Sequence, residues 1–227
     1  MKRNQSGFTL IEIAIVLVII GLLLGGVLKG QELINSARVK NIATDFKNIP
    51  VYIYGYQDKF RSLPGDDIQA ASHVANAVTC AAAANKCALG NGIIDGPWNA
   101  VDATNESFLF WQHVRLAGLA PGATDTTQGQ AYLPVNASGG IIGIQSGTTT
   151  VANSPVIDSA GAAIRGSYII CSTGILGKFV KQLDIQMDDG NTASGSMMAL
   201  SGTTLGTSAT ATANIDDAAS YTICMGV

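Results

Sequence analysis

An uninterrupted apolar segment near the N-terminus constrains this chain more than any other feature. It runs from Phe8 to Leu28, and Glu12 is its only charged residue before Lys29. About 21 residues are enough for an α-helix to cross a bilayer core of roughly 30 Å. A carboxylate inside such a segment is costly, so Glu12 needs a partner and a functional reason. The segment therefore predicts a membrane helix with a specific task for one acid.

The short leader at residues 1–7 distinguishes this segment from an ordinary secretory signal. A secretory signal places its cleavage site after the apolar region, which is then discarded. Here the plausible processing site, Gly7 followed by Phe8, precedes the apolar region, and no A-x-A pattern follows that region. Cleavage after Gly7 would therefore keep the hydrophobic helix in the mature protein.

The hexapeptide at residues 7–12 (GFTLIE), with the apolar residues behind it, resembles the N-terminus of type IV prepilins and type II secretion pseudopilins. The resemblance implies that a membrane aspartyl peptidase cuts after Gly7 and that the new N-terminal Phe8 is methylated. It also implies that Glu12 corresponds to the acid of that family. The proline frequent in the middle of the family's helix is absent, and Lys29 stands near its place.

The resemblance implies a structural function and no enzymatic activity. The expected protein is a filament subunit that is stored in the inner membrane with its head in the periplasm. Two filaments stay open: a type IV pilus on the cell surface, or the periplasmic pseudopilus of a type II secretion system. The expected partners are other pilin subunits, the prepilin peptidase and an inner-membrane assembly platform. The alternative from another class is a membrane-anchored periplasmic binding or enzymatic domain.

Glu12 has two interpretations. In a packed filament its carboxylate could form an ion pair with the α-amino group of Phe8 from a neighbouring subunit. A buried ion pair adds little net stability, but it fixes the axial position of one subunit relative to the next. The alternative is that Glu12 only caps the helix start, where negative charge is favourable. The sequence and the resemblance favour the pairing with a neighbour.

Four glycines follow within the same segment or just behind it: Gly21, Gly25, Gly26 and Gly30. Their spacing is typical of close-packed faces between membrane helices. Each glycine also weakens a helix by about 1 kcal/mol relative to alanine. We expect local weakening of the helix on assembly, with some close packing.

The predicted fold class is α+β and pilin-like, with a long N-terminal helix packed on a C-terminal antiparallel sheet. The expected parts are a cleaved leader at 1–7, a helix at 8–61 whose residues 8–28 span the membrane, and a globular head at 62–227. Beyond the membrane, apolar residues recur at alternating spacings of three and four, which indicates an amphipathic helix. They are Val39, Ile42, Phe46, Ile49, Ile53, Tyr56 and Phe60.

The head begins with a turn signal at residues 63–67 (LPGDD), which also resembles a junction in many prepilin-type proteins. Short helices are expected at 68–78, at about 105–116 with Asn105 or Thr104 as the cap, and at 179–187. Short apolar runs between Gly, Ser, Thr and Asn clusters predict antiparallel strands at 140–145, 167–171, 197–200 and 221–225.

Four cysteines permit three disulfide pairings. Cys80 and Cys87 bracket a short hexapeptide, which fits a small disulfide loop. Cys171 and Cys224 fall in two of the predicted strands, where a disulfide would fasten the C-terminal strand to the sheet. The favoured pairing is therefore Cys80–Cys87 with Cys171–Cys224.

Little in the sequence indicates chemistry. The net charge of −3 with 13% charged residues gives no sign of the basic patch that nucleic-acid-binding proteins carry. Neither a P-loop nor a G-x-S-x-G motif is present. The two histidines, His73 and His113, lack ligands at metal spacing. No cofactor is expected. The best oxygen-ligand cluster for calcium is Asp184, Asp188 and Asp189, which misses the EF-hand spacing, so a solvated helix end is the default.

Overall fold

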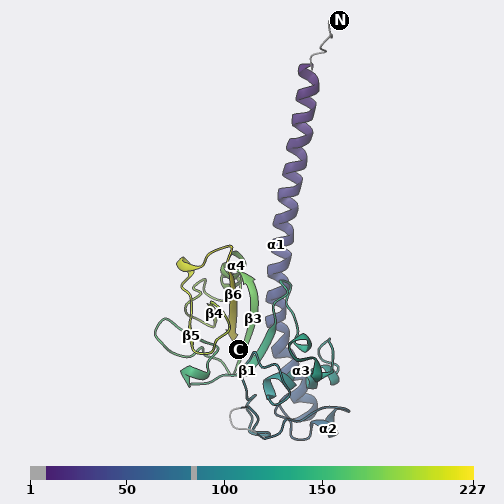
Figure 1. Ribbon diagram of the computed structural model, residues 1–227, viewed down its shortest axis with the longest axis vertical. Coiled ribbons are helices and arrows are strands. Elements are labelled where there is room, and N and C mark those ends of the chain that lie inside the picture. The colour runs from purple at the N-terminus through teal and green to yellow at the C-terminus, as the bar shows by residue number, and fades with distance from the viewer. Residues whose placement is uncertain (1–8, 83–85) are drawn as a thin grey trace, which may run out of the picture. The chain divides into compact units, whose positions relative to one another are not determined.

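The computed structural model describes residues 9–82 and 86–227 (Figure 1). The chain divides into two units, Met1–Arg38 and Val39–Val227. A long apolar helix at the N-terminus and a four-stranded antiparallel sheet confirm the α+β, pilin-like layout. Gly7 and Phe8, the expected processing position, lie outside the described residues.

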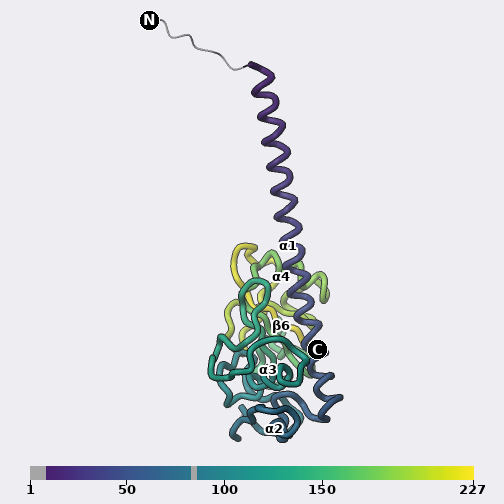
Figure 2. Tube along the Cα trace, turned by 90° about the vertical axis from the view of Figure 1, so that its right-hand side faces the viewer, coloured from purple at the N-terminus to yellow at the C-terminus, as the bar shows by residue number. Residues whose placement is uncertain are grey.

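Helix α1 spans Leu10–Phe60, and Pro50 lies inside it. Figure 2 draws this helix as a coiled tube. Its first part is apolar and unburied: every described side chain up to Leu28 is exposed to its surroundings. By length and composition this helix could cross a membrane. Side chains of this kind, in contact with no protein, need lipid or another subunit around them.

The second part of α1 belongs to the core of the head, because the unit that contains the sheet begins at Val39. The apolar residues predicted at helical spacing, from Val39 to Phe60, form a stripe along one face of this part of the helix. This stripe is buried except for Phe60, which is half-buried. It packs with α3 (Glu106–Leu116), whose Phe108, Phe110, Trp111 and Val114 belong to the same cluster. Helix α1 therefore supplies one wall of the head's hydrophobic core.

The main sheet has the strand order β1-β3-β6-β4, and all its pairs are antiparallel. The strands are β1 (Ile142–Ser146), β3 (Tyr168–Leu176), β6 (Ser220–Gly226) and β4 (Met197–Leu200). All four predicted strands are present, and β3 extends five residues further than the sequence indicated, past a register shift between Ser172 and Ile175. The sheet thus places the C-terminal strand β6 between β3 and β4.

Helix α4 (Gly177–Met187) follows β3 directly and buries Phe179, Val180 and Leu183 in the main core. A small parallel pair, β2 (Val156–Ile157) with β5 (Thr207–Ser208), lies apart from the main sheet. Short 3-10 helices complete the described structure: η1 (Thr126–Tyr132), η2 (Val151–Asn153) and η3 (Thr212–Asn214).

The helix expected at 68–78 is wrong in length, because α2 covers only Ala70–His73. Val74 is already extended and Asn76 has a positive φ of 66°, which ends the helix. The backbone N–H of Val78 instead donates to the side chain of Gln112 on α3. A tertiary contact therefore overrides the local helical pattern.

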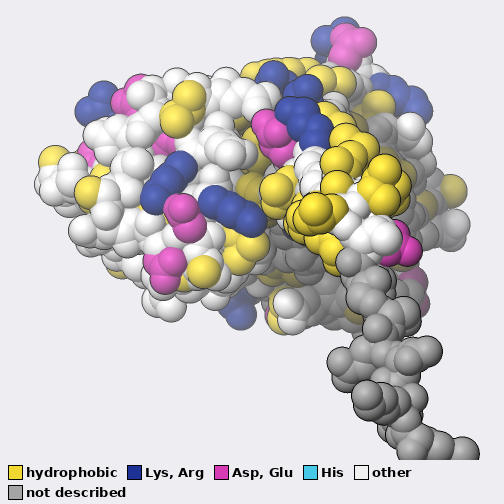
Figure 3. All heavy atoms as spheres, turned by 90° about the horizontal axis from the view of Figure 1, so that it is seen from above, with side chains coloured by type: hydrophobic (Ala, Val, Ile, Leu, Met, Phe, Trp, Pro, Cys, Tyr) yellow, Lys and Arg dark blue, Asp and Glu magenta, His cyan; other side chains and the backbone are white. Residues whose placement is uncertain are grey.

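The surface of the head agrees with the low charge of the sequence. In the view of Figure 3, uncharged side chains and backbone cover most of the described surface, hydrophobic side chains gather on one part of it, and charged side chains lie singly or in small groups. The described surface therefore carries no extended basic or acidic face in this view.

Candidate functional site

Thr9 and Glu12 form a reciprocal cap at the start of α1. The backbone N–H and the hydroxyl of Thr9 donate to Oε2 of Glu12 at 2.8 and 2.7 Å, and the N–H of Glu12 lies 3.4 Å from the Thr9 hydroxyl. This is the capping-box arrangement, in which two residues three positions apart each accept a hydrogen bond from the other's backbone N–H group. Both bonds from Thr9 go to one carboxylate oxygen. Oε1 of Glu12 therefore keeps the capacity to accept a donor from another molecule.

The four glycines of the N-terminal part lie within the continuous helix. A Cβ atom added at Gly21, Gly25, Gly26 or Gly30 would meet nothing within 4 Å. The packing of the described chain on itself therefore does not require glycine at these positions. Close packing against a neighbouring helix, and weakening of α1 on assembly, stay predictions.

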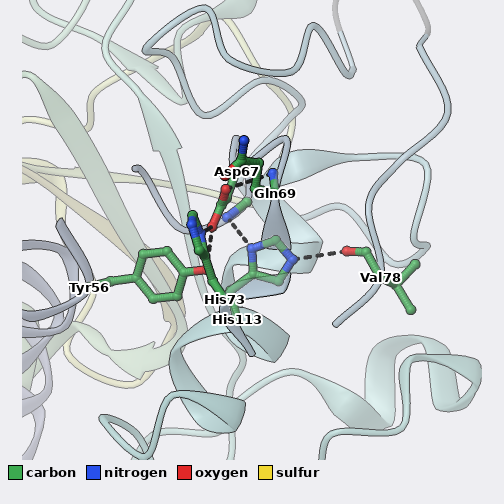
Figure 4. A network of polar contacts seen from close by, with 7 residues as sticks. Tyr56, Asp67, Gln69, His73, Val78 and His113 are labelled. Carbon is green, nitrogen blue, oxygen red and sulfur yellow. Dashed lines mark hydrogen bonds and ion pairs between the residues drawn. The ribbon is translucent and has the colours of Figure 1, made fainter. Parts of the chain in front are cut away.

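Asp67 ties the end of α1 to the head. Its side chain is buried and accepts three hydrogen bonds: from the Tyr56 hydroxyl at 2.8 Å, the Gln69 N–H at 2.9 Å and Nδ1 of His73 at 2.6 Å (Figure 4). Burial alone would raise the pKa of Asp67, but the bonds from His73, Tyr56 and Gln69 outweigh it and lower the pKa. Asp67 is therefore held as a carboxylate that anchors Tyr56 of α1.

The neighbouring acid, Asp66, organises a different segment. Its carboxylate accepts backbone N–H bonds from Gly90, Asn91 and Gly92. Gly90 and Gly92 have positive φ angles of 76° and 79°, which allow the chain to wrap around the carboxylate. Burial raises the pKa of Asp66 despite these bonds. The two acids of the LPGDD turn therefore hold two separate parts of the head.

Glu106, at the start of α3, is fully buried. Its two oxygens accept the N–H groups of Ala88 at 2.8 Å and Asp95 at 2.9 Å. Burial raises the pKa of Glu106 to about 7, and the nearby negative charges of Asp66 and Asp95 add to this effect. This residue clamps the segment that follows the Cys80–Cys87 loop.

Neither histidine forms a catalytic arrangement with a described nucleophile. His113 is buried; its Nδ1 accepts the N–H of Gly65 at 2.9 Å and its Nε2 donates to the carbonyl of Val78 at 2.9 Å (Figure 4). Because Nδ1 accepts an N–H, the ring is neutral and bridges two loops. Burial lowers the pKa of His113 and so favours the same form. His73 stacks on Phe60 with ring centroids 5.1 Å apart. Both rings therefore serve the junction between α1 and the head.

The cysteines form the disulfides Cys80–Cys87 and Cys171–Cys224, the pairing favoured from the sequence. Cys171 and Cys224 are register partners on β3 and β6. This bond links strands that are 53 residues apart in the chain. It constrains the unfolded chain far more than the short Cys80–Cys87 loop does, on the chain-entropy account.

The calcium candidates Asp184, Asp188 and Asp189 do come together, with one carboxylate oxygen from each within 4.8 Å of the others. Asp184 is buried; its Oδ1 accepts the N–H of Gly190 at 2.9 Å, and its Oδ2 has no partner among the described residues. Burial raises the pKa of Asp184 to about 6, and Asp188 and Asp189 contribute to this shift. The donor set is of the kind that calcium takes, but it supplies fewer than the six to eight oxygens required. The expectation from the sequence, a solvated helix end without a cofactor, stays a prediction.

A family model described as the prokaryotic N-terminal methylation motif matches residues 2–28. The chain carries the type IV prepilin and pseudopilin signature. No curated protein and no solved structure matches the chain. The prepilin signature thus covers the leader and the apolar start of α1, whereas the head must be interpreted from its own residues.

Sequence reasoning on this prepilin-type chain missed the roles of Asp67 and Glu106. The sequence marks Asp66 and Asp67 only as part of the turn at residues 63–67, whereas the structure shows that they organise the head. The available signal was the pair of acids directly after a Pro-Gly turn, in a chain with few charges. Glu106 gave no signal, because an acid at the start of a helix is ordinary.

One described surface pocket adds no chemistry to the prepilin signature. A surface pocket of about 480 Å³ is lined by residues 147–149, Val151 and residues 162–166. Its lining contains one charged side chain, Arg165, and no carboxylate, imidazole or thiol. This pocket therefore offers no acid, base or nucleophile, and the signature indicates a structural subunit.

Proposed function

We propose that this chain is a structural subunit of a type IV pilus-like filament. It is made as a prepilin, cleaved after Gly7, methylated on Phe8 and assembled through its hydrophobic N-terminal helix. The observation that carries the proposal is the methylation motif at residues 2–28 in front of a helix with two parts. The first part is apolar with no protein around it, and the second part is built into the head. The cap with Thr9 occupies only Oε2 of Glu12, and a helix needed only as an anchor would have no use for the second carboxylate oxygen within its apolar part.

The proposed partners and locations follow from this function. The prepilin peptidase would process the leader while α1 lies in the inner membrane and the head in the periplasm. An assembly platform in that membrane would then transfer the subunit into a filament of like subunits. The alternative filament is the periplasmic pseudopilus of a type II secretion system, which the same observations fit. Electron microscopy of intact cells separates the two, because a pilus extends from the surface.

Glu12 sets the register of the filament on this proposal. Its Oε2 is held by Thr9 within the subunit, so Oε1 is left to accept the α-amino group of a neighbour's Phe8. Removal of the carboxylate would leave that amine without its counter-charge in an apolar filament core, which costs several kcal/mol. Assembly would suffer, whereas insertion into the membrane would become easier.

Glu12→Ala in the native host tests the proposal. We expect normal membrane insertion and a filament yield at least about tenfold lower, which corresponds to a loss of about 1.4 kcal/mol. Glu32→Gln is the matched control, since Glu32 is an exposed acid on the same helix that pairs with Lys29 at 2.7 Å. Normal filament yield together with normal methylation in Glu12→Ala would contradict the role of Glu12. Absence of filaments in the parent strain under all growth conditions would contradict the proposed function itself.

A further inference from the structure

Asp45, on the head part of α1, has no charge partner among the residues that the structure describes. Its carboxylate is half-buried and has no hydrogen bond or ion pair with any described residue. The positions one turn away on α1, at 41–42 and 48–49, hold only asparagine and isoleucine. Burial raises the pKa of Asp45, and no donor opposes that effect. An unpaired, half-buried carboxylate is unfavourable, so a cation from another molecule would improve this site.

The pocket beside Asp45 has room for one side chain from another molecule. Asp45 lines a pocket of about 150 Å³ together with Tyr52, Trp111 and Val135. This is smaller than the 300–1,000 Å³ typical of small-molecule sites. The aromatic rings of Tyr52 and Trp111 are favourable neighbours for a cation. The nearby Arg115 does not serve as the partner, because its guanidinium donates to the carbonyls of Pro121, Ala123 and Tyr132.

The filament register indicates which cation reaches Asp45. If Glu12 of one subunit meets the α-amino group of residue 8 of the next, the two copies are offset by four residues, or about 6 Å along a helix. Two identical copies in a filament are shifted by the same axial distance along the whole length of α1. Asp45 therefore lies level with residue 41 of the neighbour, directly beside that neighbour's Lys40.

We propose that Asp45 of one subunit and Lys40 of the neighbouring copy form a second intersubunit ion pair along α1. This inference rests on the proposed filament function and adds a contact on the head part of the helix. Lys40 is exposed, and no described carboxylate pairs with it. Within one subunit the two residues cannot pair, because five residues place them about 140° apart around the helix. The pair would form only on assembly.

Charge exchange tests this contact directly. Asp45→Lys and Lys40→Asp each place like charges together, so each should lower filament yield by about tenfold or more, a cost of at least 1.4 kcal/mol. The double variant carries both changes and restores an opposite-charge pair, so its yield should return to within about threefold of the parent. Asp45→Asn, which keeps the shape of the side chain, should give an intermediate yield.

Lys47→Asp is the matched control. Lys47 is exposed on the same part of α1. At the four-residue offset it lies level with Ala43 of one neighbour and with Val51 of the other, so it meets no opposite charge. We expect a filament yield within about twofold of the parent, as for typical exposed charges.

The results separate this inference from the function on which it rests. If the parent forms filaments and the two single variants do so equally well, the ion pair is wrong and the filament function stands. If the single variants fail and the double variant fails too, the pairing of Asp45 with Lys40 is wrong. If the parent forms no filaments at all, the proposed function fails first. Rescue by the double variant supports the pair and also shows that the single variants did not fail through misfolding.

Discussion

Glu106 should make the stability of the head depend on pH between about 4.5 and 7. The folded protein holds this carboxyl fully buried with a pKa of about 7, against an ordinary value of 4.5. Because the folded pKa is raised, the folded state binds the proton more tightly than the unfolded state across this window. The free energy of unfolding therefore falls as pH rises through it and levels off above pH 7.

The size of the effect follows from the shift. Each pKa unit corresponds to 1.36 kcal/mol, so Glu106 should account for a loss of about 2 to 3 kcal/mol between pH 5 and pH 8. Asp184, with a pKa raised to about 6, adds a loss of the same sign centred at lower pH. Glu106→Gln removes the titration while it keeps the shape of the side chain. It should flatten the part of the profile between pH 6 and 7.

Urea unfolding of the detergent-solubilised protein at several pH values provides the assay. Trp98 and Trp111 are both buried, so their fluorescence reports on the unfolding of the head. Asp58→Asn, at an exposed position on α1, is the control and should keep the slope of the parent. An unchanged slope in Glu106→Gln would refute the assignment of the pH dependence to this buried carboxyl.

Two further variants test the junction between α1 and the head. Tyr56→Phe removes one of the three donors to buried Asp67 and should lower the free energy of unfolding by about 1–3 kcal/mol, whereas Tyr54→Phe, at an exposed position on the same helix, should change urea unfolding little. Equal effects of the two changes would contradict the anchoring role of Asp67. Gly65→Ala should destabilise more than Gly92→Ala in thermal unfolding: both have positive φ, but only at Gly65 would a Cβ meet a backbone atom, the Glu106 carbonyl oxygen at 2.5 Å. Equal losses at the two positions would show that the positive φ alone decides the cost, and would contradict the role of the close contact at Gly65.

Local patterns were enough to predict the elements of this fold. The stripe from Val39 to Tyr56 repeats at helical spacing, and four short apolar runs correspond to the four strands of the main sheet. The residues that organise the head were not accessible in this way. Asp67 depends on Tyr56, 11 positions earlier, and Glu106 on N–H groups up to 18 positions away. Such partners are brought together only by the tertiary fold.

The N-terminal site shows the opposite limit. The motif around Gly7 and Phe8 is strong in sequence and matches the methylation family model, yet these residues lie outside the described structure. The described start of α1 contributes the Thr9–Glu12 cap and a carboxylate oxygen that stays available. The chemical identity of the mature N-terminus depends on processing in the cell, so the structure of the precursor does not reveal it.

Mass spectrometry of the intact protein and of its N-terminal peptide, purified from the native host, tests the central claim most directly. The account predicts a chain that begins at Phe8 and carries one added methyl group on its α-amino nitrogen. A chain that begins at Met1, or at a residue beyond Leu28, would contradict it. The apolar helix would then be a plain anchor or a discarded signal.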